Sequence, residues 1–176
     1  MNAIRRSVVR LVCAALFAPL AATAQAQDAT GPVPPAVTQA HTVFISNAGG
    51  DAGLFPSPFS GDPSRGYSTF YQKLKAAGGL QVVDSPAQAD LVLEISLTAP
   101  NGSLNENKVY GVADPRPMFR LTVYDRTTHT ILWTETQLVQ MAFGQKTHDR
   151  NFDNAVDTLA SRFLSISGHA APPAGH

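Results

Sequence analysis

Leu91-Val92-Leu93-Glu94-Ile95-Ser96-Leu97 is the stretch of this 176-residue chain that decides its fold. Leucine or isoleucine occupies every second position, and Val92, Glu94 and Ser96 stand between them. Because successive side chains of a β-strand point to opposite faces of a sheet, this alternation predicts a strand with one buried side. Glu94 indicates that the other face of the sheet is open to water or only half covered.

Four further strands are expected around this one. Residues 42–46 are a β-branched and aromatic run that a glycine-containing loop follows, and residues 80–83 form a second short run. Residues 118–124 and 130–138 are separated by a five-residue connection that begins with Asp125. Aspartate at the start of so short a connection is typical of a hairpin turn.

A helix is predicted after the first long loop. Asp62 and Pro63 have the residue types that favour a helix start, and Gly78-Gly79 can end the helix in a left-handed conformation. Between them, apolar side chains recur with helical spacing: Tyr67, Phe70, Tyr71, Leu74 and Ala77.

A second helix is predicted near the end of the chain. Thr147 or Asp149 can cap its start, and Gly168 stops it. Its apolar face consists of Phe152, Ala155, Val156, Leu159, Phe163 and Ile166.

The element order is therefore β-α-β-β-β-β-α. This order predicts an α+β fold in which two helices pack on one face of a mixed, mostly antiparallel sheet of four or five strands. The first strand–helix–strand unit is expected to be parallel. We place this single domain at residues 41–167.

The first 26 residues have the three-part pattern of a secretory signal peptide. Arginines at positions 5, 6 and 10 precede an apolar run at residues 11–22, and Ala24-Gln25-Ala26 supplies a cleavage site of small residues. The apolar run is too short for a membrane-spanning helix, which needs about 20 residues. We therefore expect a periplasmic or secreted protein without a stable membrane anchor after cleavage. The adjacent arginines leave both general and twin-arginine export open.

Two segments outside the domain are expected to be unstructured. Residues 27–40 contain three prolines and few large apolar side chains, which is typical of a flexible spacer. Residues 168–176 are similarly rich in alanine, proline and glycine, and we expect a disordered tail there.

Charge and cysteine content exclude several classes of function. The chain has 13 basic and 13 acidic residues, and cleavage removes three arginines and no acid, which leaves a net charge of −3. A mildly acidic protein lacks the electrostatic footprint of a nucleic-acid-binding protein. The only cysteine, Cys13, lies in the signal, so the mature chain has no disulfide, thiolate metal ligand or cysteine nucleophile.

The sequence contains no strong catalytic, cofactor or metal motif, so we assign no catalytic, cofactor-binding or metal-ligating residue. The glycines of residues 47–53 do not have phosphate-loop spacing. His148, Asp149 and Asp153 lie close together, but helix capping explains the two aspartates. No nucleophile elbow is present.

Two long irregular segments carry the residues that a partner is most readily expected to contact. Residues 47–61 hold Phe55 and Phe59, and residues 98–117 hold Tyr110 and Arg116. Apolar side chains on such segments either pack against the edge of the core or form a partner surface. Both alternatives stay open from the sequence.

Three stretches of the chain resemble a group of uncharacterised secreted bacterial proteins. The resemblance lies in residues 89–95 (ADLVLEI), residues 121–134 (LTVYDRTT followed by ILWT) and residues 151–156 (NFDNAV). The element order is more remotely similar to the small periplasmic α/β domains of the TolB N-terminal and LpoB type. The resemblance implies an interaction module and supplies no catalytic residues.

We therefore expect an exported, non-catalytic binding module without a cofactor, whose partner is an envelope protein. The alternative is a small envelope hydrolase or ligand-binding protein with a cleft between residues 47–61 and 98–117.

We predict that the mature protein begins at Gln27. N-terminal sequencing of the exported protein tests this, and Ala26→Phe should leave the precursor uncleaved because the protease needs a small residue there. An exported wild-type chain that still begins at Met1 would contradict a cleaved signal.

Overall fold

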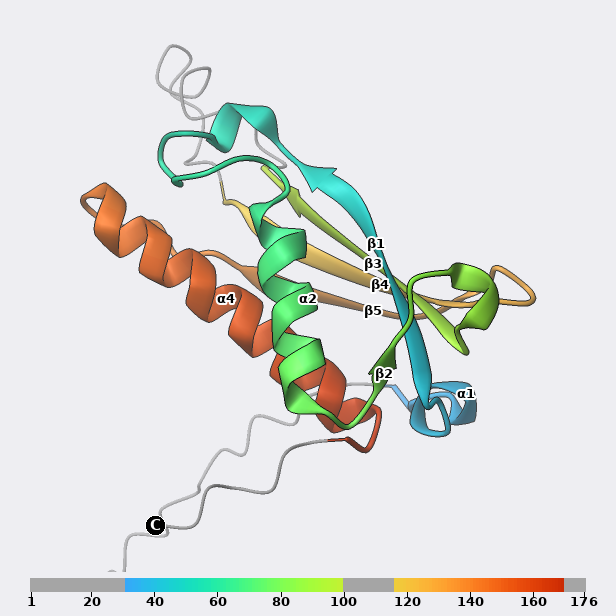
Figure 1. Ribbon diagram of the computed structural model, residues 1–176. Helices are drawn as coiled ribbons and strands as arrows, with labels where there is room; N and C mark the ends of the chain where they lie inside the picture. Colours follow the sequence, from blue (N-terminus) through green and yellow to red (C-terminus); the bar gives the residue numbers. More distant parts are fainter. Residues whose placement is uncertain (1–30, 100–115, 170–176) are drawn as a thin grey trace, which may run out of the picture. The chain divides into compact units, whose positions relative to one another are not determined.

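The computed structural model describes residues 31–99 and 116–169, and these residues form an α+β domain (Figure 1). The strands are β1 (Thr42–Gly50), β2 (Gln81–Val82), β3 (Leu91–Thr98), β4 (Met118–Asp125) and β5 (Ile131–Leu138). The helices are α1 (Pro35–Thr38), α2 (Arg65–Ala77) and α4 (Gln145–Ile166), and short 3-10 turns lie at Ala52–Leu54 and Pro86–Gln88.

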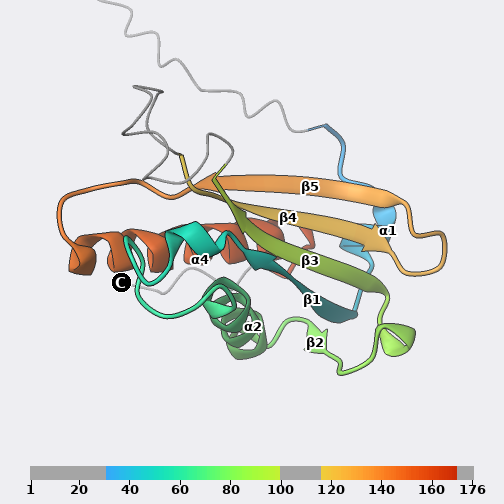
Figure 2. The ribbon, with the colours of Figure 1, turned by 90° about the horizontal axis from the view of Figure 1, so that it is seen from above.

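The five strands form one mixed sheet in the order β2-β1-β3-β4-β5. β1 pairs in parallel with both β2 and β3, whereas the long pairings of β3 with β4 and of β4 with β5 are antiparallel. Both long helices, α2 and α4, lie on the same face of the sheet (Figure 2). The predicted fold class is confirmed, and so is the parallel first unit.

The core lies between the helices and one face of β3. Leu91, Leu93, Ile95 and Leu97 are all at most 4% exposed, whereas the residues between them are half-buried. The antiparallel register places Val123, Leu121 and Phe119 of β4 beside this row, and these three side chains are also buried. The alternation in the sequence thus identifies the covered side of the sheet.

β1 is longer than predicted because its glycines continue the strand instead of ending it. The register between β1 and β3 shifts between Asn47 and Gly50, and Gly49 has a φ of 82°. A bulge with glycine in the left-handed region takes up the one extra residue and lets Gly50 pair with Leu97. The loop expected at residues 47–61 therefore starts only after this bulge.

α2 follows the prediction closely at its end and begins slightly later. Gly78 has a φ of 70° and ends the helix in the left-handed conformation. At the start, the Ser64 N–H donates to the Asp62 carboxylate, so Asp62 orders the turn before the helix although Ser64 is the cap.

α4 begins four residues before Asp149, so neither Thr147 nor Asp149 is its N-cap. Gly144 occupies that position with a φ of 83°. Asp149 lies inside the helix and contacts the loop that precedes α2. In the part of the chain that the structure describes, no helix has the length and apolarity to span a membrane.

The described parts of the predicted spacer and tail, residues 31–40 and 168–169, both contact the domain. α1 lies within residues 27–40, and its Val37 is fully buried, as is nearly all of Ala40. The His169 ring hydrogen-bonds to the Ala40 carbonyl at 3.0 Å, and the backbone N–H of His169 donates to the Leu164 carbonyl at 2.8 Å. Val37 and Ala40, with Val33 packed against the core, dock a proline-rich segment that composition alone predicts to be a spacer.

We predict that Gly66→Ala destabilises the protein by roughly 1–3 kcal/mol through overpacking. A Cβ at Gly66 would lie 2.6 Å from the ring of Phe119, which is fully buried. Urea unfolding measures the loss. The matched variant Ser68→Ala, at an exposed position of the same helix, should change the free energy of unfolding by no more than about 0.5 kcal/mol. Equal effects of the two substitutions would contradict the close packing of α2 on β4.

Candidate functional site

The two edges of the sheet differ in length. β2 forms one edge and is two residues long, whereas β5 forms the other and is eight residues long. A strand at an edge presents unpaired backbone N–H and C=O groups to which another strand can bond. β5 is therefore the edge with room for such a strand.

The backbone geometry identifies which groups of β5 are free. Val139, directly after the strand, donates its N–H to the Pro117 carbonyl at 2.8 Å. In an antiparallel ladder, residues that bond to the neighbouring strand alternate with residues that do not. Counting back from Val139, the backbones of Thr134, Thr136 and Leu138 turn away from β4. In the described part of the chain no strand pairs with them.

The exposed large apolar side chains of the described residues all belong to β5 or to the segment after it. They are Ile131, Leu138 and Phe143, which are 61%, 50% and 100% exposed. Ile131 and Leu138 stand at the two ends of the same edge strand, so a strand paired with β5 would lie against both.

A bulge at the start of β5 places Ile131 and Leu138 on the same face. Trp133 pairs with Val123 of β4, and the next residue of β4 pairs with Ile131. This leaves one extra residue, Leu132, in β5. Both apolar side chains consequently lie on the face opposite the helices, with threonines between them.

The helix-facing side of β5 carries its only charge, Glu135. Arg162 of α4 donates from Nη1 to a carboxylate oxygen of Glu135 at 2.7 Å. Glu135 is mostly buried, whereas the side chain of Arg162 is 51% exposed. The guanidinium therefore has further donors at the rim of the sheet.

A polar cavity of about 210 Å³ lies beside the end of β5. Its lining is rich in amide side chains and comes from β5, the segment after it and α4: Gln137, Leu138, Gln140, Asn151, Asn154, Ala155 and Thr158. Amides donate and accept hydrogen bonds without carrying charge, so this cavity suits an uncharged polar group.

The structure separates the four residues considered as a partner surface. Phe59 is fully buried, and its ring centroid lies 5.2 Å from that of Phe152, so it is part of the core and not of a surface. Phe55 is half-buried against the same two rings. Arg116 is exposed, and Tyr110 lies outside the described residues.

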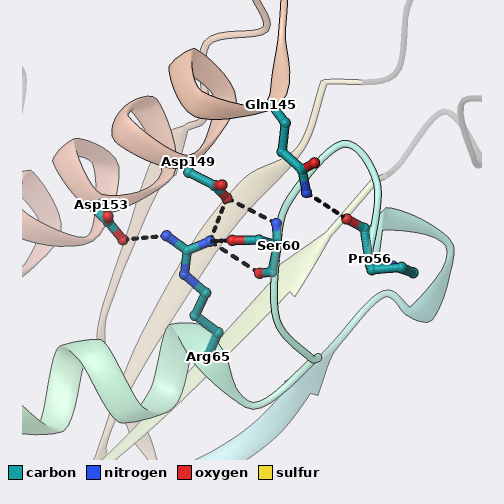
Figure 3. Close-up of polar contacts among 6 residues, drawn as sticks. All are labelled: Pro56, Ser60, Arg65, Gln145, Asp149 and Asp153. Carbon is teal, nitrogen blue, oxygen red and sulfur yellow. Dashed lines mark hydrogen bonds and ion pairs between the residues drawn. The ribbon is translucent and has the colours of Figure 1, made fainter.

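Residues 47–61 are held against α4 by a group of polar contacts that we call the Arg65 cluster (Figure 3). Arg65 donates to Asp149 at 2.5 Å and to Asp153 at 2.8 Å, and it also bonds to the carbonyl of Ser60 at 3.0 Å. Its guanidinium stacks 4.4 Å from the centroid of Phe152.

The backbone of the loop completes this cluster. The N–H of Ser60 donates to Asp149 at 2.9 Å, and the amide of Gln145 donates to the carbonyl of Pro56 at 3.0 Å. These contacts join the loop to the first turns of α4 (Figure 3). The two aspartates that stood close to His148 in the sequence thus bind an arginine. The His148 ring meets the carbonyl of Ala142.

The ionisation of Asp149 follows from these contacts. Burial acts to raise the pKa of Asp149, but the hydrogen bonds from the Ser60 N–H and the Arg65 guanidinium outweigh it. The pKa of this carboxyl is therefore held below its ordinary value, and the carboxylate stabilises the fold at neutral pH.

A cavity of about 300 Å³ lies between the end of β1 and the end of β3, and most of the cleft expected between residues 47–61 and 98–117 lies outside the described residues. The cavity is lined by residues 48–51 and 96–99, and Asp51 is its one titratable side chain among the described residues. That carboxylate accepts a hydrogen bond from the N–H of Gly53. Within residues 31–99 and 116–169, no three His, Asp or Glu side chains are placed to hold a metal ion.

No protein-family model matches the chain, and no curated protein sequence is significantly similar to it. Among solved structures, a PelC dodecamer from Paraburkholderia phytofirmans is similar at 15% identity and a TM-score of 0.46, over 78% of this chain and 94% of that one. A DUF4136 family protein from Bacteroides thetaiotaomicron gives 12% and 0.48, over 74% and 91%. A DUF330 protein from Xanthomonas campestris gives 14% and 0.44, over 77% and 90%. At these values the three proteins assign neither a family nor a function to this chain.

We predict that Asp149→Asn lowers the free energy of unfolding by about 1–2 kcal/mol at pH 7, because it removes a charged acceptor from the Arg65 cluster. A carboxyl whose pKa is lowered by folding stabilises the native state above its unfolded pKa, near 4, and this contribution is lost as pH falls through the folded pKa. The difference between wild type and variant should therefore shrink below about pH 4.

Urea unfolding across this pH range measures the effect, and Asp153→Asn is the matched control. The Asp153 side chain binds the same arginine but is 50% exposed, so its loss should cost less. A difference that stays constant with pH would contradict the role given to the Asp149 charge.

Proposed function

We propose that this protein is an exported, non-catalytic binding module that holds an extended strand of a partner protein against β5. The main support is the difference in length between the two edge strands: β2 has two residues and β5 has eight. The predicted signal peptide and the resemblance to periplasmic interaction domains support the location and the kind of function.

Among the described residues, β5 has only part of the protection that edge strands usually have. Soluble proteins shield long edges with lysine, proline, a β-bulge, an inward-pointing charge, a covering element or a short strand length. β5 contains neither lysine nor proline, and its only charged side chain, Glu135, already binds Arg162 on the helix-facing side. The bulge lies at one end of β5 and Arg162 neutralises the Glu135 charge, so residues 133–138 are open to pairing in the described part of the chain.

The chemistry of the edge suits recognition by strand addition. The outward N–H and C=O groups of Thr134, Thr136 and Leu138 supply main-chain hydrogen bonds, which give affinity whatever the partner's sequence. Side chains on the open face and the amide-lined cavity beside Leu138 add selectivity. None of these contacts requires an ionisable catalytic group.

We predict that a photo-reactive residue at position 138 forms covalent adducts with a bound protein in the producing cells. Thr136→Pro in the same chain should reduce the yield roughly tenfold, because it removes one outward N–H and obstructs pairing. Thr136→Val keeps that N–H and should retain the adducts. Gel mobility and mass spectrometry measure yield and mass.

A photo-reactive residue at Gln72, which is exposed on α2, is the matched control site. The N–H of Thr136 does not bond to β4, so the Thr136→Pro variant should still fold. A circular-dichroism melt checks this. Absence of adducts at position 138, or equal yields from positions 138 and 72, would refute the proposed function.

A further inference from the structure

The open face of β5 has nearly the same pattern in both directions along the strand. Because of the bulge, this face carries Ile131, Thr134, Thr136 and Leu138 in that order, with an apolar side chain at each end and threonine at both inner positions. A strand with this symmetry is complementary to an antiparallel copy of itself.

We propose that the strand that pairs with β5 is β5 of a second copy of this chain, related by a two-fold axis that passes through Glu135. This inference rests on the proposed function and names its partner. The pairing joins two five-stranded sheets into one continuous sheet, with the helices of both copies on the same side.

The outward backbone groups fix the register of this pairing. With the axis at Glu135, Thr134 of one copy lies opposite Thr136 of the other, and the reverse pair forms on the far side of the axis. Both threonines turn their N–H and C=O groups away from β4, so each pair can exchange two main-chain hydrogen bonds. Cross-strand threonine pairs are themselves favourable in antiparallel sheets.

The same register covers the exposed apolar side chains. Leu138 of each copy lies beside the bulge at Ile131 and Leu132 of the other copy. The two large apolar side chains of β5 that are at least half exposed in the single chain thus contact each other across the interface. An unrelated extended peptide would need apolar side chains at the same two positions.

The charges at the axis are balanced. Two copies bring two Glu135 carboxylates together, and opposed like charges alone would disfavour pairing. Arg162 already binds Glu135 at 2.7 Å and retains exposed donors at the rim of the sheet. The axis therefore gathers two carboxylates and two guanidiniums, and a guanidinium can bond to more than one carboxylate.

Paired charge substitutions test this register in the full chain by sedimentation velocity. Thr134→Lys combined with Thr136→Lys places lysine opposite lysine of the second copy, and should raise the dimer dissociation constant about tenfold or more. Thr134→Lys combined with Thr136→Glu places lysine opposite glutamate, and should keep the constant within about threefold of wild type. These variants alter the same two exposed positions, so a general effect of charge on folding would affect both.

Three results would overturn the inference. They are a wild-type protein that is monomeric at its highest soluble concentration, a double-lysine variant that dimerises as tightly as wild type, and a lysine–glutamate variant whose dimer dissociates as readily as that of the double-lysine variant. A monomer that still forms adducts with another protein at position 138 would refute the self-pairing and leave the proposed function standing. A monomer without any adduct would refute both.

Discussion

The burial of one face of β3 is the constraint on which the rest of this structure depends. Its leucines and isoleucine exclude water only if other elements cover that face, and α2 and α4 do so from the same side. Among the described residues, no helix covers the opposite face of the sheet. β3 is the central strand of the sheet. The registers of β1 and β4 with β3 place their buried side chains on the same face, beside the row of buried side chains on β3.

This arrangement also determines where the domain can bind another molecule. The connection through α2 leads from β1 to β2. β2 pairs beside β1 and forms one edge of the sheet with only two residues. The hairpin of β4 and β5 builds the other side and ends in a full-length strand. The Arg65 cluster holds the long loop against α4 through Ser60, Asp149 and Asp153, so the stabilising polar contacts and the proposed binding surface use different residues (Figure 3).

Features that depend on neighbours in sequence could be predicted, and features that depend on distant contacts could not. The alternation of β3 and the glycine that ends α2 are local signals, and both are confirmed. Asp149 has the residue type of a helix cap, but its partner Ser60 lies 89 residues away, and that contact is invisible to local patterns. Phe59 resembles a surface residue because prolines and glycines surround it, yet the rings of the core enclose it. The free edge of β5 follows from the order of strands in the sheet, which no single stretch encodes.

Amide hydrogen exchange, resolved residue by residue and followed over protein concentration, distinguishes a paired β5 edge from a free one. The outward-facing amides of Thr134, Thr136 and Leu138 should become protected as the protein concentration rises and lose protection on dilution. The inward-facing amides of Glu135 and Gln137 should stay protected throughout, because β4 holds them. Outward-facing amides that exchange equally fast at every concentration would show that β5 does not pair with a second copy.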